Sequence, residues 1–201
     1  NWEKPKRHAL TEEQQSAFIN FVANSDTYKH WLSLFTTFLG TGCRVGEIVG
    51  LRWKDCDFEN NTISINHNTI YRQQEDGKCR FNITTPKTES GKRIIPMLAE
   101  VKKALLTERK NQVAQGTFFN DTVVDGYKGF VFVNRFGYIH NPMTINRAIV
   151  RIYKAYNEQE TKQAKEENRE PVLIPHFSVH NLRHTFCTRF CENESNIKVI
   201  Q

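Results

Sequence analysis

The chain has 201 residues, enough for one ordinary domain with a buried core or for two small ones. Hydrophobic residues make up 38% and charged residues 25%, a balance that excludes collagen-like and coiled-coil sequences and argues against disorder. Lys and Arg number 28 against 22 Asp and Glu, and the formal charge of +6 makes a polyanion the first partner to consider. The same charge could serve solubility alone, so it does not by itself identify the partner.

Three helices are predicted before the first change of pattern. Thr11 can cap the first, with Gln14 at the capping-box position, and the apolar spacing of residues 17–22 continues it. A second is predicted over residues 28–39 and ends at the glycines of residues 40–42, because glycine adopts the left-handed geometry that closes a helix. The third follows at once, and its apolar positions are Val45, Ile48, Val49 and Leu51.

The period of the apolar pattern then changes from helical to two, which is typical of strands. Alternation appears in residues 62–65, 69–71, 81–84 and 93–96, and turn signals separate these segments. The sequence therefore predicts a three-stranded antiparallel meander between about Asn61 and Pro96.

Helical character returns over residues 98–112 and again over residues 143–157. Between them, residues 130–133 predict a short buried strand or an extended segment. Residues 158–170 carry five acids and three bases, so they net −2 while the rest of the chain nets +8. This segment predicts a solvated helix or an exposed acidic insertion.

Pro171 and Pro175 require an extended approach to a last helix that begins near Ser178. The sequence holds no internal repeat, low-complexity tract or Gly/Ser linker. We therefore expect one domain over residues 1–201, mainly α with a small three-stranded antiparallel sheet (α+β). An apolar helical pattern starts in residues 197–200 and breaks off at Gln201, so we expect the chain to be a piece of a larger domain.

Localisation is indicated by cysteine usage and by the absence of targeting segments. No apolar run approaches the ~18 residues that a membrane span requires. Residues 1–8 are polar and basic, without the apolar stretch of a signal peptide. The five cysteines are scattered and odd in number, which favours a reducing compartment over a disulfide framework. We therefore expect a cytoplasmic protein with no membrane partner.

Three groups of residues could carry chemistry. Residues 41–47 place Arg44 after a glycine loop at the start of a helix, where a guanidinium and backbone N–H groups suit a phosphate. Residues 84–93 join two strands and carry Lys87, which could reach a DNA backbone or donate a proton. His180 and Arg183 share a helix face and offer a proton-transfer group beside a fixed positive fork. Each has an ordinary alternative: a solvated arginine, a soluble hairpin turn and a chance His-x-x-Arg match.

A zinc site is a competing interpretation of the last helix. Histidine and cysteine are residue types that bind zinc. One face of this helix carries four of them, at positions i, i+4, i+7 and i+11: His180, His184, Cys187 and Cys191. One straight helix cannot wrap its side chains around a tetrahedral ion, and phenylalanines are interleaved, so a packed helix is preferred. We expect no metal and no other cofactor, and the chain lacks the glycine-rich motifs of nucleotide hydrolysis.

Taken in order, the three groups resemble the catalytic domain of tyrosine recombinases, the phage-integrase family, and in particular the integrases of conjugative transposons. The matching residues are Thr41, Gly42, Cys43 and Arg44 with Glu47, Leu51 and Asp57; Thr85, Pro86, Lys87 and Thr88 with Arg93 and Pro96; and residues 180–185. The resemblance implies a tyrosine-recombinase catalytic-domain fold and an enzyme that cuts and rejoins DNA at specific sites. Such an enzyme integrates or excises a mobile element through a 3′-phosphotyrosyl intermediate, without ATP or metal.

The resemblance also implies roles for individual residues. Arg44 and Arg183 would clamp the non-bridging oxygens of the scissile phosphate, and Lys87 would be the general acid for the leaving 5′-oxygen. His180 would assist proton transfer to or from the nucleophile, and Glu47 would support the fold around Arg44 without touching substrate. These residue types suit the reaction, because phosphoryl transfer places charge on oxygens that arginines stabilise and the leaving alkoxide needs a proton. The implied partners are double-stranded DNA and further recombinase protomers assembled on it.

The sequence departs from the family pattern where the nucleophilic tyrosine belongs. Eighteen residues follow Arg183, none of them Tyr or Trp, the one His among them is the adjacent His184, and all six tyrosines precede His180. We therefore expect a catalytic core that lacks its C-terminal end and is inactive alone, with the nucleophile beyond Gln201. The alternative function is a non-catalytic basic DNA-binding module. Both functions predict DNA affinity, and activation of a phosphate by Arg44 and Arg183 distinguishes them.

Overall fold

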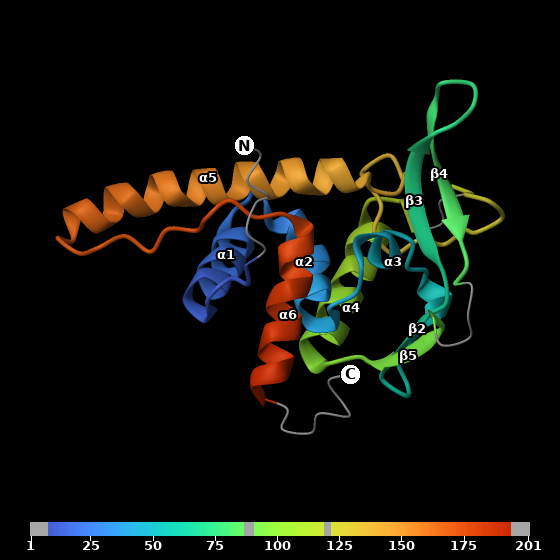
Figure 1. Cartoon of the computed structure of the whole chain (residues 1–201), viewed down its shortest axis with the longest axis horizontal. Helices are drawn as coiled ribbons and strands as arrows, with labels where there is room; N and C mark the ends of the chain where they lie inside the picture. The colour runs from blue at the N-terminus through green and yellow to red at the C-terminus, as the bar shows by residue number, and fades with distance from the viewer. Residues whose placement is uncertain (1–7, 87–90, 119–121, 194–201) are drawn as a thin grey trace, which may run out of the picture. The chain divides into compact units, whose positions relative to one another are not determined.

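The computed structural model describes residues 8–86, 91–118 and 122–193 of the chain. It divides into two compact units: unit 1 is Asn1–Gly42 with Asn146–Gln201, and unit 2 is Cys43–Ile145. Figure 1 shows the elements of both units along the chain. That the two units form the single domain expected from the sequence stays a prediction. Within the described residues, no helix combines the length and the apolar character needed to cross a bilayer.

The first helix of unit 1, α1 (Glu12–Asn24), begins as the sequence predicts. The Thr11 hydroxyl accepts a hydrogen bond from the Gln14 backbone N–H at 3.1 Å, and the Gln14 side chain accepts one from the Thr11 N–H at 3.1 Å. This reciprocal pair satisfies two of the N–H groups that a helix start leaves unpaired. Phe18 on this helix is fully buried, and its ring lies 5.1 Å from that of Phe35 and 5.1 Å from that of Phe177.

The second helical stretch begins as a 3-10 turn, η1 (Lys29–Trp31), and continues as α2 (Leu32–Thr41). The helix runs through Gly40 and Thr41, so Gly42 alone closes it, with φ +59°. α2 packs against α6 (Val179–Asn193), and the two lie side by side in Figure 1. A Cβ atom at Gly42 would lie 2.1 Å from the ring of Phe186, so both the backbone geometry and this close approach require glycine.

The longest helix is α5 (Pro142–Glu166), and most of it belongs to unit 1. α5 includes the helix predicted over residues 143–157 and continues into the acidic segment, of which residues 158–166 are helical. One face of this part is covered, because Glu160 and Ala164 are buried. The chain then returns without regular structure, and α6 begins at Val179 after the two prolines, as predicted. Asn157 fastens the return by exchanging hydrogen bonds with the backbone of Ile174 at 2.8 and 2.9 Å.

Among its described residues, unit 2 contains two whole α-helices, one 3-10 turn and five strands, and it ends in the first turn of α5. The elements are α3 (Val45–Val49), η2 (Trp53–Asp55), β1 (Cys56–Asp57), β2 (Thr62–Ile65), β3 (Asn68–Gln73), β4 (Cys79–Thr84), β5 (Arg93–Pro96) and α4 (Ala99–Ala114). The predicted helix over residues 98–112 is therefore confirmed. Residues 130–133 form the extended alternative: Phe130 and Val133 make isolated bridges, to Arg52 and to Ile139.

The strands form two separate antiparallel arrangements. β2 lies between β1 and β5 in a three-stranded sheet, while β3 and β4 pair only with each other. The small three-stranded antiparallel sheet is thus confirmed, but its predicted meander connection is wrong. Both edges of β2 are occupied by β1 and β5, so the hairpin of β3 and β4 that follows does not pair with β2. In Figure 1 the ribbon of β3 and β4 extends away from β2 and β5.

Candidate active site

Arg44 stands immediately before α3, in an extended conformation that turns the chain into the helix. Its side chain is 65% exposed, so its guanidinium is accessible to a ligand. Glu47, one turn further on, accepts a hydrogen bond from the Arg44 backbone N–H at 2.8 Å and one from Arg44 Nη1 at 3.2 Å. Arg44 is therefore anchored to its own helix by main chain and by side chain.

Glu47 is the centre of this arrangement and is only 7% exposed. Arg93, at the start of β5, donates to the two carboxylate oxygens from Nη1 at 3.0 Å and Nη2 at 2.8 Å. Burial alone would raise the pKa of Glu47, but hydrogen bonds from Arg93 and from the Arg44 N–H, with both guanidinium charges, hold it below its ordinary value. The bond to Glu47 in turn raises the pKa of Arg93. A buried carboxylate thus stays charged between two arginines.

His180 and Arg183 lie on one face of α6, in unit 1. His180 is exposed, and its ring meets that of His184 edge to face, with the centroids 4.6 Å apart. Arg183 is half-buried and donates from Nη1 to the backbone carbonyl of Gly42. The second arginine is therefore held by a neutral carbonyl, whereas Arg44 is held by a carboxylate.

Lys87, the predicted general acid, lies outside the described residues. The described chain on either side ends a strand at Thr84 and begins another at Arg93, and these strands belong to different sheets. Its predicted role stays a prediction.

The structure brings the predicted residues together in two sets. Arg44 and Glu47 meet Arg93 in unit 2, and His180 and Arg183 share a helix in unit 1. The convergence of the two sets on one phosphate stays a prediction. Sequence reasoning named Arg93 only as a matching residue and missed its pairing with Glu47. The available signal was an acid at position 47 inside the apolar run of a short helix, since a buried carboxylate needs a charged partner.

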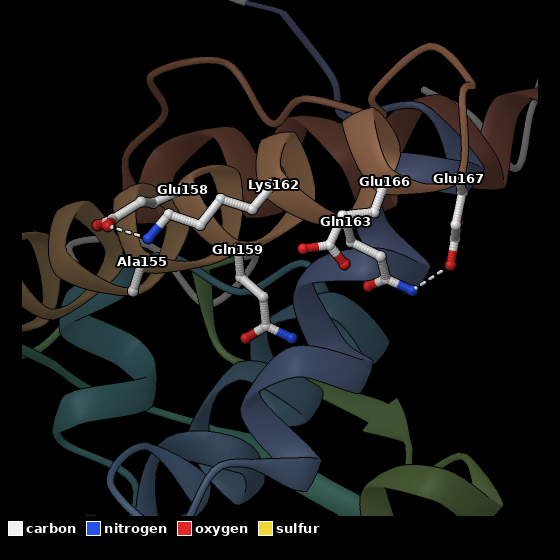
Figure 2. Close-up of a pocket in the computed structure, with 7 residues that line it drawn as sticks. All are labelled: Ala155, Glu158, Gln159, Lys162, Gln163, Glu166 and Glu167. Atoms are coloured by element: carbon white, nitrogen blue, oxygen red, sulfur yellow. Dashed lines mark hydrogen bonds and ion pairs between the residues drawn. The ribbon is translucent and has the colours of Figure 1, made fainter.

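Two further features of the described residues bear on the site. Across residues 8–86, 91–118 and 122–193, no group of three or more His, Cys, Asp or Glu side chains is arranged to hold a metal ion. A surface depression of about 620 Å³ lies along the C-terminal half of α5. Figure 2 shows its polar lining, including the 2.9 Å ion pair of Lys162 with Glu158. None of the predicted site residues lines it, so it is not the candidate active site.

Comparison with known proteins identifies the family of the chain. The model of the phage integrase family matches residues 8–201. The transposase from transposon Tn916 of Enterococcus faecalis is 33% identical over 198 residues, which cover 96% of this chain and 43% of the relative. The tyrosine recombinase XerC-like protein of Caldanaerobacter subterraneus is 28% identical over 177 residues, covering 84% of this chain and 40% of the relative.

A solved structure of the Tn1549 transposon integrase, in complex with transposon right end DNA, is similar over 99% of this chain and 58% of that one. The TM-score is 0.83 and the sequence identity is 31%. The chain belongs to the phage integrase family, the tyrosine recombinases. Its mainly α fold with a small antiparallel sheet is that of the transposon integrase. The chain spans less than half the length of the curated relatives named above.

Proposed function

We propose that this chain is the phosphate-binding core of a DNA recombinase that cuts and rejoins strands at specific sites, to integrate or excise a mobile element. The observation that carries the proposal is the arrangement around Glu47. A buried carboxylate fixes the backbone and side chain of Arg44 while leaving that side chain 65% exposed. Preorganised charge of this kind is what stabilises the oxygens of a phosphoryl group during transfer.

In the proposed reaction, a tyrosine oxygen attacks the scissile phosphorus and the bond from phosphorus to the 5′-oxygen breaks. Arg44 and Arg183 bind the non-bridging oxygens, on which charge develops. Lys87 gives its proton to the leaving 5′-oxygen, and His180 accepts or returns the proton of the nucleophile. Attack by a 5′-hydroxyl on the phosphotyrosyl bond reverses these transfers and rejoins the strand, so no cofactor is consumed.

The nucleophile is not assigned to any tyrosine of this sequence. All six precede His180, whereas the family pattern places the nucleophile after the His-x-x-Arg helix. We therefore propose that it lies beyond Gln201 and that the 201-residue chain binds DNA without forming a covalent adduct. The proposed partners are double-stranded DNA and further protomers on the same DNA, in keeping with a similar integrase solved in complex with transposon DNA.

The test uses nicked duplexes that tile the DNA flanking the parent gene, with covalent adducts resolved on a denaturing gel. The 201-residue chain should give none, and the parent protein continued past Gln201 should give one. Arg44→Ala or Arg183→Ala in the longer protein should each slow cleavage by about a hundredfold, since losing one preorganised transition-state contact costs about 3 kcal/mol. Arg169→Ala is the matched control, because that arginine pairs with Glu160 in unit 1.

Two outcomes contradict the proposal. An adduct formed by the 201-residue chain would show that the nucleophile is misplaced. A longer protein that cleaves equally well without Arg44 would show that the phosphate clamp is misplaced. If the longer protein binds DNA tightly but cleaves none of the tiled duplexes, the non-catalytic DNA-binding module is the better description.

A further inference from the structure

Two neighbouring aromatic side chains project from one turn of unit 2. Phe136 is 68% exposed and Tyr138 is 62% exposed, although the residue that follows, Ile139, is buried. They belong to the segment 134–138, named here the aromatic turn, which a bridge between Val133 and Ile139 closes at its base. Large aromatic rings exposed on one turn indicate a contact surface, because they contribute nothing to the core.

The aromatic turn is held by its own hydrogen bonds. The Asn134 side-chain oxygen accepts from the N–H groups of Phe136 at 2.9 Å and Tyr138 at 3.2 Å. The Asn134 N–H donates to the Tyr138 carbonyl at 2.8 Å, and the Gly137 N–H donates to the Asn134 carbonyl at 2.7 Å. Gly137 has φ +83°, which a residue with a side chain rarely adopts. The rings are therefore presented on a fixed backbone, which lowers the entropy cost of binding.

The charge of the turn favours an anionic partner. The guanidinium of Arg135, also exposed, lies 4.8 Å from the centroid of the Phe136 ring. Within residues 122–145 the one acid is Asp125, and its carboxylate accepts a hydrogen bond from the Ile83 N–H at 2.7 Å. Lys128 is exposed in the same stretch. The turn itself, residues 134–138, thus presents aromatic surface and the charge of Arg135 and contains no acid, although Asp125 of the same stretch is exposed.

The turn is also connected to the helix that positions Arg44. The Val131 N–H donates to the carbonyl of Leu51 at 2.8 Å, two residues after α3 ends, and Phe130 makes a bridge with Arg52. Residues 130–131, which lead into the aromatic turn, are therefore hydrogen-bonded to residues 51–52, which follow α3. The turn thus belongs to the same hydrogen-bonded part of unit 2 as α3.

We propose that the aromatic turn is a contact site for double-stranded DNA, in which Phe136 packs against sugars and base edges in a groove and Arg135 pairs with a phosphate. Apolar wedges flanked by arginine are a known means of gripping a duplex groove, and aromatic contacts with bases are worth a measurable share of affinity. This inference rests on the proposed function, since it requires that the chain binds DNA.

The test measures binding of a labelled 30-base-pair duplex of arbitrary sequence to the chain by fluorescence anisotropy, over a series of salt concentrations. Arg135→Ala should reduce the steepness of log affinity against log salt by about 0.9, the contribution of one phosphate. Phe136→Ala should weaken binding about tenfold at every salt concentration without changing that slope. Phe136→Leu, which keeps apolar surface, should lose less DNA affinity than Phe136→Ala.

Two control variants come from exposed positions of unit 1. Leu173→Ala removes exposed apolar surface, and Lys162→Ala removes a charge from the acidic end of α5. Neither should change affinity or slope, and thermal unfolding checks that every variant is folded. Benzoylphenylalanine in place of Phe136 should cross-link to the labelled duplex under ultraviolet light, whereas the same residue at position 173 should not.

The outcomes separate this inference from the proposed function. If the parent chain shows no salt-dependent DNA binding, the proposed function fails and this inference fails with it. If the parent chain binds DNA but the turn variants bind equally well and do not cross-link, the turn is not a DNA contact and the proposed function stands. If Phe136→Ala instead changes the self-association of the chain in sedimentation experiments, the turn is a protein interface and the inference is overturned.

Discussion

Two buried glutamates, one in each unit, each carry a charge that is stabilised by the same kinds of partner. Glu47 in unit 2 is 7% exposed and Glu160 in unit 1 is 8% exposed. Each receives two hydrogen bonds from one arginine, Arg93 or Arg169, and one from a backbone N–H. Hydrogen bonds hold the pKa of both carboxyls below the ordinary value, although burial opposes this and is the largest single influence on Glu47.

The two glutamates differ in what else they hold. Glu160 ties the C-terminal part of α5 to the returning chain at Val172. Glu47 has a further partner, the exposed guanidinium of Arg44, at 3.2 Å. Similar buried ion pairs can therefore be purely structural at one place and also hold an exposed arginine side chain at another. Only the extra, solvent-facing arginine distinguishes the two.

The largest expected effect is on stability, and it should be similar at both places. Glu47→Gln and Glu160→Gln each remove a buried negative charge and one ionic partner of an arginine, although Arg169 keeps its ion pair with Glu167. We expect each to lower the free energy of unfolding by about 2–3 kcal/mol. Urea unfolding followed by tryptophan fluorescence and circular dichroism measures this. If Glu47→Gln leaves the free energy of unfolding unchanged, the buried charge of Glu47 does not stabilise the fold and this prediction is wrong.

The second prediction concerns pH. Because the folded pKa of each glutamate is lower than its unfolded value, the unfolded chain binds more protons in the range between them. The stabilisation is therefore fully present above the ordinary value of 4.5 and is lost as the pH falls through the folded values. The free energy of unfolding should decrease as the pH is lowered from 6 to 3.5. In each Gln variant it should decrease less steeply than in the parent chain. Above the folded pKa values only part of the stabilisation is lost, so the effect is smaller than that of substitution.

Glu160→Gln serves as the control for a third prediction, on DNA affinity. Without its carboxylate partner, Arg44 must be ordered when it binds a phosphate, and an arginine carries about 2 kcal/mol of rotamer entropy. We expect Glu47→Gln to weaken duplex binding about tenfold, or about 1.4 kcal/mol, and Glu160→Gln to leave it unchanged. Equal losses in the two variants would mean that both act through general destabilisation, which would remove the functional distinction between them.

Local signals in the sequence predicted local structure well. The capping pair of Thr11 and Gln14, the alternation in residues 62–65 and the proline-directed start of α6 each depend on neighbours within a few residues. The connection of the strands could not be predicted, because alternation shows that a strand exists and not which edge it pairs with. The pairing of Glu47 with Arg93 could not be predicted either, because the two residues lie 46 positions apart in the chain. The family motif identified Arg44, His180 and Arg183, but their burial and partners depend on tertiary contacts.

The smallest expected effect separates charge from geometry at Arg44. If Arg44 binds a phosphate, Arg44→Ala should reduce the steepness of log affinity against log salt by about 0.9, because one fewer counterion is released. Arg169→Ala should leave the slope unchanged, since that guanidinium is engaged by Glu160 and Glu167. Arg44→Lys keeps the charge but loses the planar fork, so its slope should match the parent while its affinity falls. A lower slope for Arg169→Ala and not for Arg44→Ala would reverse the assignment, making the Glu160 pair the one that faces DNA.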